Sequence, residues 1–170
     1  MGFLTPNEIK SFQSLYTLQL RYLLNTETQI VKGLDSMIAH ASDTQLKQAF
    51  QSHKQETEVQ ADRLRQLIAE VNDGDPDDKK DVIVTALIGS AENIVSESEA
   101  GPVRDAGLLA TAQKIEHYEI ASYGTARSWA KLLNLPRHVE LLQKSLDEEK
   151  HADHLLGTIA DRTNTSAASA

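Results

Sequence analysis

Residues 111–126 read TAQKIEHYEIASYGTA. Within this stretch Ala112, Tyr123 and Ala126 recur at helical spacing, and Glu116 and Glu119 lie between them on the same face. An ionised carboxylate alone in a dry core is prohibitively costly, so it must be protonated, paired with a cation or bound to a metal ion. The stretch therefore predicts a long helix, from about 103 to 133, whose buried face carries acids that need a partner.

Three other long segments repeat apolar residues in the same way. They predict helices from the capping stretch Thr5-Pro6-Asn7-Glu8 to about His40, from the turn at 42–44 to about 72, and from about 137 to 162. A shorter apolar segment, 82–94, follows an acidic loop at 73–78. Four long helices with an extra element between the second and third predict two antiparallel hairpins joined by a long crossover. We therefore expect an all-α fold, a ferritin-like four-helix bundle with an additional short helix in the crossover.

Each long segment carries an acid or an imidazole near the middle of its apolar face. The candidate metal ligands are Glu27, His53, Glu56, Glu116, Glu119, Glu149 and Asp153. Where a segment carries two of them, they lie three or four residues apart and share one helix face. Six carboxylates against one histidine leave too little protein cation to balance them, whereas two bound metal ions would. A hard, oxygen-rich cluster suits iron, with manganese or a mixed pair as alternatives.

The fourth long helix offers two competing pairs. Standard dimetal bundles place one Glu on each of two helices and Glu-x-x-His on each of the other two. The pair Glu148 and His151 would restore that motif, but its helix face is the less apolar one. Glu149 and Asp153 lie between leucines on the better inward face, so the apolar pattern favours them.

Taken singly, each candidate also has a plainer interpretation. Glu27 could be a boundary residue near solvent, and Glu116 with Glu119 could lie on an exposed face. His53 and Glu56, which reverse the usual Glu-x-x-His order, could form a surface hydrogen-bonded pair. The metal hypothesis therefore rests on four groups at matching depth rather than on any one of them.

Other polar residues give weaker signals. Tyr123 flanks these acids and is placed to donate a hydrogen bond to a ligand, with a core tyrosine near one end of the bundle as the equal alternative. His138, His151 and His154 are predicted to lie on the surface.

Composition limits the class of protein and its partners. The 170 residues are 40% hydrophobic and only 5% aromatic, with few glycines and prolines, which favours helices in one domain, 1–162, followed by a disordered tail, 163–170. The net charge of −8 argues against a nucleic acid or an anionic membrane as partner. The chain contains no cysteine, and it shows neither a signal peptide nor an apolar run long enough to span a membrane, so we expect a soluble cytoplasmic protein.

Several stretches resemble the YciF-type bacterial ferritin-like proteins. They are LKQAF at 46–50, HKQETE at 53–58, VRDAGL at 103–108, EHYEIASYG at 116–124 and LDEEKHAD at 146–153. The resemblance extends over about residues 5–162. It implies a ferritin-like bundle, usually a homodimer, with a candidate dimetal site and an association with bacterial stress responses. It also implies that His151 is not a ligand, and it does not identify a reaction.

The residues and the resemblance together predict a protein that holds two iron ions in the centre of a bundle. The expected principal carboxylates are Glu27, Glu56, Glu116 and Glu149, with His53, Glu119 and Asp153 completing or tuning the site. Such a site would oxidise Fe(II) with dioxygen or peroxide. Two alternatives remain open at this point: a structural or interaction protein whose buried acids are protonated or paired, and a carboxylate-bridged oxidase that acts on an organic substrate.

Overall fold

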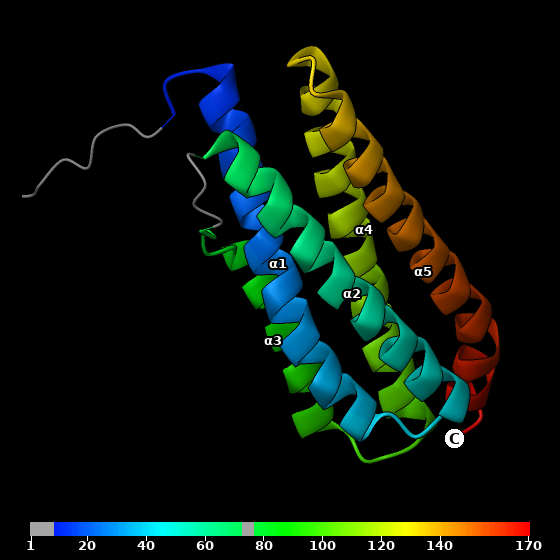
Figure 1. Ribbon diagram of the computed structural model, residues 1–170. Helices are drawn as coiled ribbons and strands as arrows, with labels where there is room; N and C mark the ends of the chain where they lie inside the picture. Colours follow the sequence, from blue (N-terminus) through cyan, green and yellow to red (C-terminus); the bar gives the residue numbers. More distant parts are fainter. Residues whose placement is uncertain (1–8, 73–76) are drawn as a thin grey trace, which may run out of the picture.

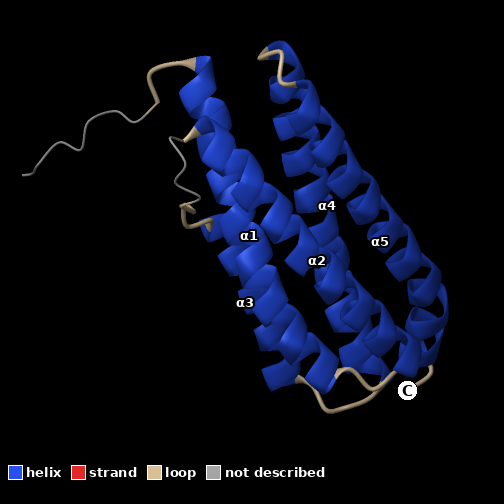
Figure 2. Ribbon diagram, in the orientation of Figure 1, coloured by secondary structure: helices blue, strands red, loops and turns tan. Residues whose placement is uncertain are grey.

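Five helices make up the protein in the computed structural model, which describes residues 9–72 and 77–170. They are α1 (Phe12–His40), α2 (Thr44–Val71), α3 (Val82–Glu97), α4 (Pro102–Leu132) and α5 (Pro136–Ala168) (Figure 1). Within these ranges the chain contains no strand (Figure 2), so the predicted all-α fold is confirmed. None of the helices in the described ranges is long and apolar enough to cross a lipid bilayer.

The four long helices pair as two hairpins. Helices α1 and α2 run in opposite directions, as do α4 and α5, and these two pairs make the most extensive helix contacts (Figure 1). The hairpins meet through contacts of α1 with α4 and of α2 with α5. The short helix α3 lies in the connection between the hairpins and packs against α1 and α4. The predicted extra helix between the second and third long helices is therefore present.

Short polar side chains begin three of the helices. Ser11 accepts a hydrogen bond from the Ser14 amide at 3.0 Å, and Asp43 accepts one from the Leu46 amide at 2.9 Å. The Asp81 side chain caps α3 by accepting hydrogen bonds from the amides of Ile83 and Val84. Such caps satisfy amides that have no partner within their helix. The helix start predicted at Thr5-Pro6-Asn7-Glu8 lies outside the described residues, and the described helix begins at Phe12.

The C-terminal segment differs from the prediction. We expected a disordered tail from residue 163, but α5 continues to Ala168 and the side chain of Thr163 is buried. Small polar side chains in this segment bond back to the helix, as Thr165 does when its hydroxyl donates to the Asp161 carbonyl at 2.9 Å. Because the hydroxyls of Thr165, Ser166 and Ser169 find acceptors within the helix and alanine favours helix, a small and polar composition does not end it.

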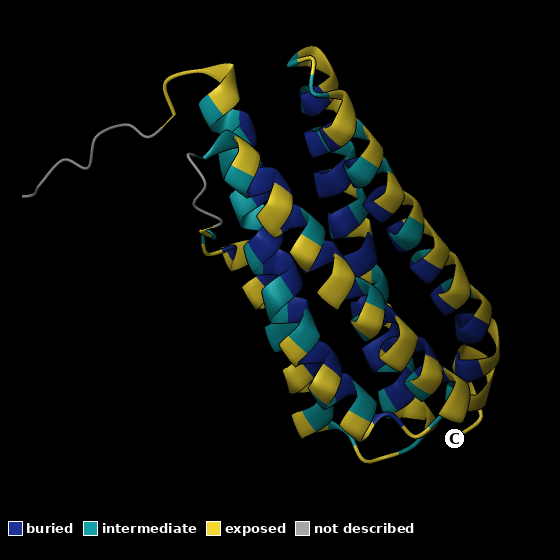
Figure 3. Ribbon diagram, viewed as in Figure 1, coloured by how far each residue is buried: buried dark blue, intermediate teal, exposed yellow. Residues whose placement is uncertain are grey.

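The buried residues lie on the helix faces that point toward one another (Figure 3). Their apolar side chains form two separate clusters. The lower cluster, nearest the α1–α2 turn, includes Ile30, Leu34, Phe50, Leu109, Ile115 and Leu156. The upper cluster, at the opposite end of the bundle, includes Leu20, Leu24, Leu64, Tyr123, Leu142 and Leu146. Along every long helix the change from one cluster to the other falls at a buried ionisable residue, so a polar layer crosses the middle of the core.

Candidate metal centre

Four buried side chains meet in this polar layer. They are His53 on α2, Glu116 and Glu119 on α4, and Glu149 on α5, and each offers a ligand atom within 4.8 Å of those of the others. His53 Nε2 lies 3.2 Å from Glu116 Oε1 and 4.0 Å from Glu149 Oε2. These four residues were among the predicted ligands, and the structure brings them together as a group that could hold a metal ion.

Glu27 on α1 adjoins this group and is fully buried. It accepts a hydrogen bond from the Tyr123 hydroxyl, so the predicted donor role of Tyr123 is confirmed. Besides burial, repulsion from Glu27 is one of the causes that raise the pKa of Glu119, so these two carboxyls are neighbours. Since Glu27 Oε2 has no hydrogen-bond partner, this carboxylate keeps one oxygen free toward the layer.

The layer holds many buried polar atoms that make no hydrogen bond. Among the described residues these include Glu27 Oε2, both ring nitrogens of His53, Glu116 Oε2, both oxygens of Glu119 and both oxygens of Glu149. Leaving one such group unsatisfied costs about 1–3 kcal/mol, so a concentration of them needs an explanation. Carboxylate oxygens with one imidazole nitrogen are a donor set suited to iron or manganese. The unsatisfied atoms therefore fit a bound metal.

Burial sets the protonation of these groups when no cation is present. Desolvation, followed by repulsion from neighbouring carboxylates, raises the pKa of Glu27, Glu116 and Glu119 well above the ordinary range. Desolvation also raises the pKa of Glu149 to about 7 and lowers the pKa of His53 to about 4. His53 is thus neutral, the form that ligates metal, while the carboxyls retain protons that a metal ion would displace.

Glu56 is not part of the buried group. Although it was predicted as a principal carboxylate, it is half-buried and lies at the edge of the layer. The buried face of α2 continues from His53 to Thr57, which is fully buried, and then to Gln60. Glu56 lines a pocket of about 60 Å³ that reaches His53 and Glu116 and is bordered by His151. It therefore stands at an opening to the centre.

Asp153 is likewise outside the four-residue group, although its charge contributes to the raised pKa of Glu116. The inward face of α5 passes from Glu149 to Ala152 and Leu156, both buried, and leaves Asp153 half-buried beside α4. There Asp153 Oδ1 lies 3.2 Å from Nε2 of the exposed His117. The four-residue group does not include Asp153, so its role as a ligand remains a prediction.

Of the competing glutamates on α5, Glu149 points into the layer and Glu148 does not. Glu149 is fully buried, whereas Glu148 is paired with Arg63, whose Nη2 lies 2.9 Å from Glu148 Oε1. Gln60 Nε2 also donates to Glu148 at 3.2 Å, and His151 is exposed. This burial agrees with the preference for Glu149. Sequence reasoning missed Arg63, because it lies beside the apolar face of α2 rather than on it.

The prediction that His138 lies on the surface is wrong. Its side chain is buried, and its Nδ1 is 2.8 Å from the hydroxyl of Tyr16, a fully buried residue. Its Nε2 lies 3.0 Å from Glu70 Oε2. A buried phenol requires a hydrogen-bond partner, so Tyr16 in an apolar stripe was the available signal that some polar group had to reach it.

Comparisons with known proteins agree with the fold. Residues 11–169 match the family described as "Domain of unknown function (DUF892)". Protein YciF of Escherichia coli (strain K12) is 34% identical over 152 residues, which cover 89% of this chain and 92% of that protein. The crystal structure of the E. coli stress protein YciF superposes with a TM-score of 0.87 at 33% identity, covering 92% of this chain and 99% of that one.

A second solved structure is equally similar. YcfI of Rhodopseudomonas palustris, for which a structural role has been suggested, has a TM-score of 0.87 at 35% identity and covers 91% of this chain and 98% of its own. The resemblance to YciF-type proteins seen in the sequence is thus confirmed by matches that extend over most of the chain. The chain belongs to the DUF892 family and is a relative of YciF.

Proposed function

We propose that this protein is a ferritin-like carboxylate protein that binds two metal ions, by preference iron, and oxidises Fe(II) with dioxygen or peroxide. Two hairpins with a helix in the crossover agree with ferritin-like connectivity. The observation that carries the proposal is the polar layer itself. Five buried ionisable groups from four helices lie between two apolar clusters, and most of their polar atoms make no hydrogen bond.

The proposed ligands are His53, Glu116, Glu119, Glu149 and Glu27. Carboxylates have two oxygens and can bridge two ions, which lets a small set serve a dimetal site. Iron bound there would supply electron-transfer chemistry with dioxygen or peroxide. Among the protein's own groups, the Tyr123 hydroxyl holds Glu27 in place through its hydrogen bond. Neutral His53 offers a nitrogen, and the carboxyls release their protons as cations bind.

The pocket beside Glu56 is the proposed entrance for metal ions. It lies between α2 and α5, is lined by Glu56 and His151, and reaches His53 and Glu116. Burial first and then Glu148 raise the pKa of Glu56, while His151 opposes that rise. A carboxylate at a narrow opening attracts cations, so we assign Glu56 to the entry of metal and the exit of protons. Asp153 remains a candidate for coordinating an ion from the α4 side.

The biological setting follows from the relatives. One of them is a stress protein, and removing Fe(II) with an oxidant limits iron-driven oxidative damage. We therefore place the proposed activity in a bacterial stress response in the cytoplasm. A homodimer is the proposed assembly.

A structural role is the second candidate, and one relative favours it, since such a role has been suggested for YcfI. The raised pKa values of the buried carboxyls also permit a folded protein whose acids are neutral rather than metal-bound. In that case the polar layer would serve only as part of a bundle that binds a partner.

Metal content distinguishes the two. Protein expressed in iron-replete cells would be analysed for metal ions per chain. The parent would be compared with a double variant that carries Glu116→Gln and Glu149→Gln, and with Glu58→Gln, which removes an exposed charge and serves as the control. We expect about two ions per chain in the parent and in the control, and almost none in the double variant. A parent that is empty, and remains empty after anaerobic addition of Fe(II), would support the structural role instead.

A further inference from the structure

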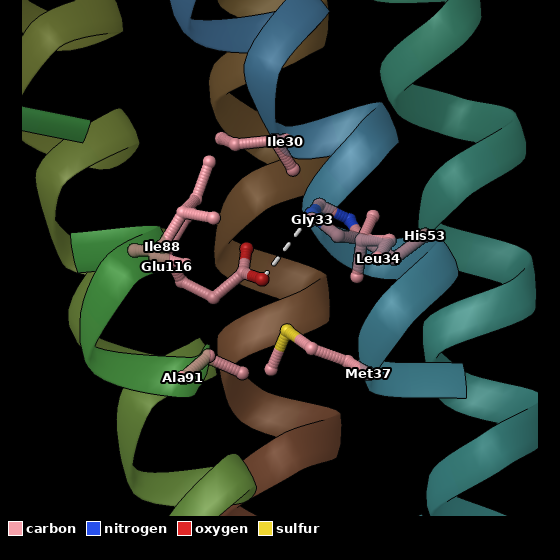
Figure 4. Close-up of a pocket in the computed structure, with 10 residues that line it drawn as sticks. Ile30, Gly33, Leu34, Met37, His53, Ile88, Ala91 and Glu116 are labelled. Carbon is pink, nitrogen blue, oxygen red and sulfur yellow. Dashed lines mark ion pairs between the residues drawn. The ribbon is translucent and has the colours of Figure 1, made fainter. Parts of the chain in front are cut away.

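A buried amide borders the polar layer on α2. Gln60 is fully buried and lies two helical turns after His53, which faces Glu116 across the layer (Figure 4). Thr57 lies between them, but its hydroxyl donates to the His53 carbonyl at 2.9 Å and is satisfied within the helix. Because burying an amide costs free energy unless it is hydrogen-bonded, the contacts that Gln60 makes across to α5 need an explanation.

Two residues fix the orientation of this amide. Gln60 Nε2 donates to Glu148 Oε2 at 3.2 Å, and since a carboxylate accepts but does not donate, the nitrogen rather than the oxygen of the amide faces Glu148. Glu148 is itself held by Arg63, which donates to both of its oxygens. Arg63 also donates to the buried Ser145 hydroxyl at 3.2 Å. A planar guanidinium bound in this way holds the carboxylate in one geometry, so Glu148 is a rigid anchor for Gln60.

The same amide lies beside Glu149, a proposed ligand. Burial is the main cause that raises the pKa of Glu149, and the Gln60 side chain is one of the groups that lower it, so the two are neighbours. An amide nitrogen carries two hydrogens, and only one of them is used on Glu148. Gln60 Oε1 and both oxygens of Glu149 have no hydrogen-bond partner among the described residues. One N–H of Gln60 is therefore available to a carboxylate that has unused acceptors.

We propose that Gln60 is a positioning residue of the metal centre, which directs an N–H toward Glu149 and holds that carboxylate in the orientation that binds a cation. Arg63 and Glu148 act through Gln60, because they anchor its amide. The inference rests on the proposed function, since Glu149 needs this orientation only as a ligand. Partners that hold ligands by hydrogen bonds typically contribute a factor of about 10–100 to metal affinity.

Binding of Mn(II) measures this contribution without any reaction. Metal-free protein would be titrated with Mn(II), and the free ion would be quantified from its electron paramagnetic resonance signal. Gln60→Met keeps the length of the side chain and removes the amide, so the dissociation constant for Mn(II) should rise about 10–100-fold. Gln60→Leu serves if the methionine variant does not fold. Gln48→Met, at an exposed position of α2, is the matched control and should bind Mn(II) as the parent does.

A second substitution separates positioning from packing. Arg63→Lys keeps the charge but loses the planar fork that holds both oxygens of Glu148. It should weaken Mn(II) binding in the parent, by less than Gln60→Met does, and should have no further effect in Gln60→Met because it acts through the amide. A folded Gln60→Met protein with the parental dissociation constant, or two losses that simply add, would overturn the inference and leave the proposed function intact. A parent that binds neither Mn(II) nor Fe(II) would instead refute the proposed function, and this inference with it.

Discussion

Replacing Glu149 with glutamine removes a buried carboxyl whose ionisation should strongly affect the pH dependence of the protein's stability. Burial, the main cause, raises the pKa of this carboxyl from 4.5 to about 7 in the folded protein. The folded state therefore holds this proton more tightly than the unfolded chain does. The stabilisation is fully present below pH 4.5, the unfolded value, and is lost as pH rises through the folded pKa of about 7.

The magnitude follows from the size of that rise. Each pKa unit corresponds to about 1.4 kcal/mol, so a rise of about 2.5 units makes metal-free parent protein about 3 kcal/mol less stable above pH 7 than below pH 4.5. Glutamine has nearly the same shape and does not ionise. Metal-free Glu149→Gln should therefore exceed the parent in stability above pH 7 by up to about 3 kcal/mol, or about 6–12 °C in melting temperature.

The assay is urea unfolding followed by circular dichroism, with chelator present, at a series of pH values from 4 to 8. Glu58→Gln, which changes an exposed carboxylate on α2, should follow the parent. The reasoning would be refuted if Glu149→Gln kept the parental dependence on pH, or if it were less stable than the parent above pH 7. Either result would mean that the Glu149 carboxyl ionises in the folded protein without cost.

Three further predictions concern binding and packing. Fe(II) added anaerobically at 100 times its dissociation constant should raise the free energy of unfolding by about 2.7 kcal/mol, and chelator should reverse the gain in melting temperature. Tyr16→Phe leaves His138 Nδ1 without its partner, so urea unfolding should show a loss of about 1–3 kcal/mol that Tyr22→Phe does not cause. The buried Asp105 carboxylate accepts hydrogen bonds from two backbone amides at the α1–α2 turn, at 2.7 and 2.8 Å. Asp105→Asn should therefore lower the free energy of unfolding by about 1.5–3 kcal/mol in the same assay without changing the metal content. Asp147→Asn should have no effect on either.

Periodicity predicted which helices form and where the polar layer lies. Burial of Glu27, Glu116 and Glu149 follows from their places among leucines and alanines, because helical spacing fixes which side chains share a face. Equal depth along antiparallel helices then brings these groups to one level. Both arguments use only spacing along the chain, and a single sequence supplies that information in full.

The finer rotation of each helix could not be predicted in this way. Residues three or four positions apart differ in direction by a fraction of a turn, and packing against neighbours decides which of them points inward. Thr57 took the inward place expected for Glu56, and Ala152 took that of Asp153. The partner of Tyr16 was equally hidden, since His138 lies far from it in sequence and meets it only through tertiary packing.

The position of the polar layer has a consequence for stability. A bundle that buried leucine at these positions would gain hydrophobic stabilisation and lose none to unsatisfied polar atoms. The layer therefore costs free energy in a protein without metal, and the cost grows with pH as Glu149 ionises. Binding of cations removes both costs, because the bound ions satisfy the unpaired oxygens and stabilise the carboxylates after their protons have left. The polar layer that divides the core into two clusters therefore lowers the stability of the metal-free protein and at the same time provides a centre that can bind and release metal ions. Stability near neutral pH should consequently depend on whether metal is bound.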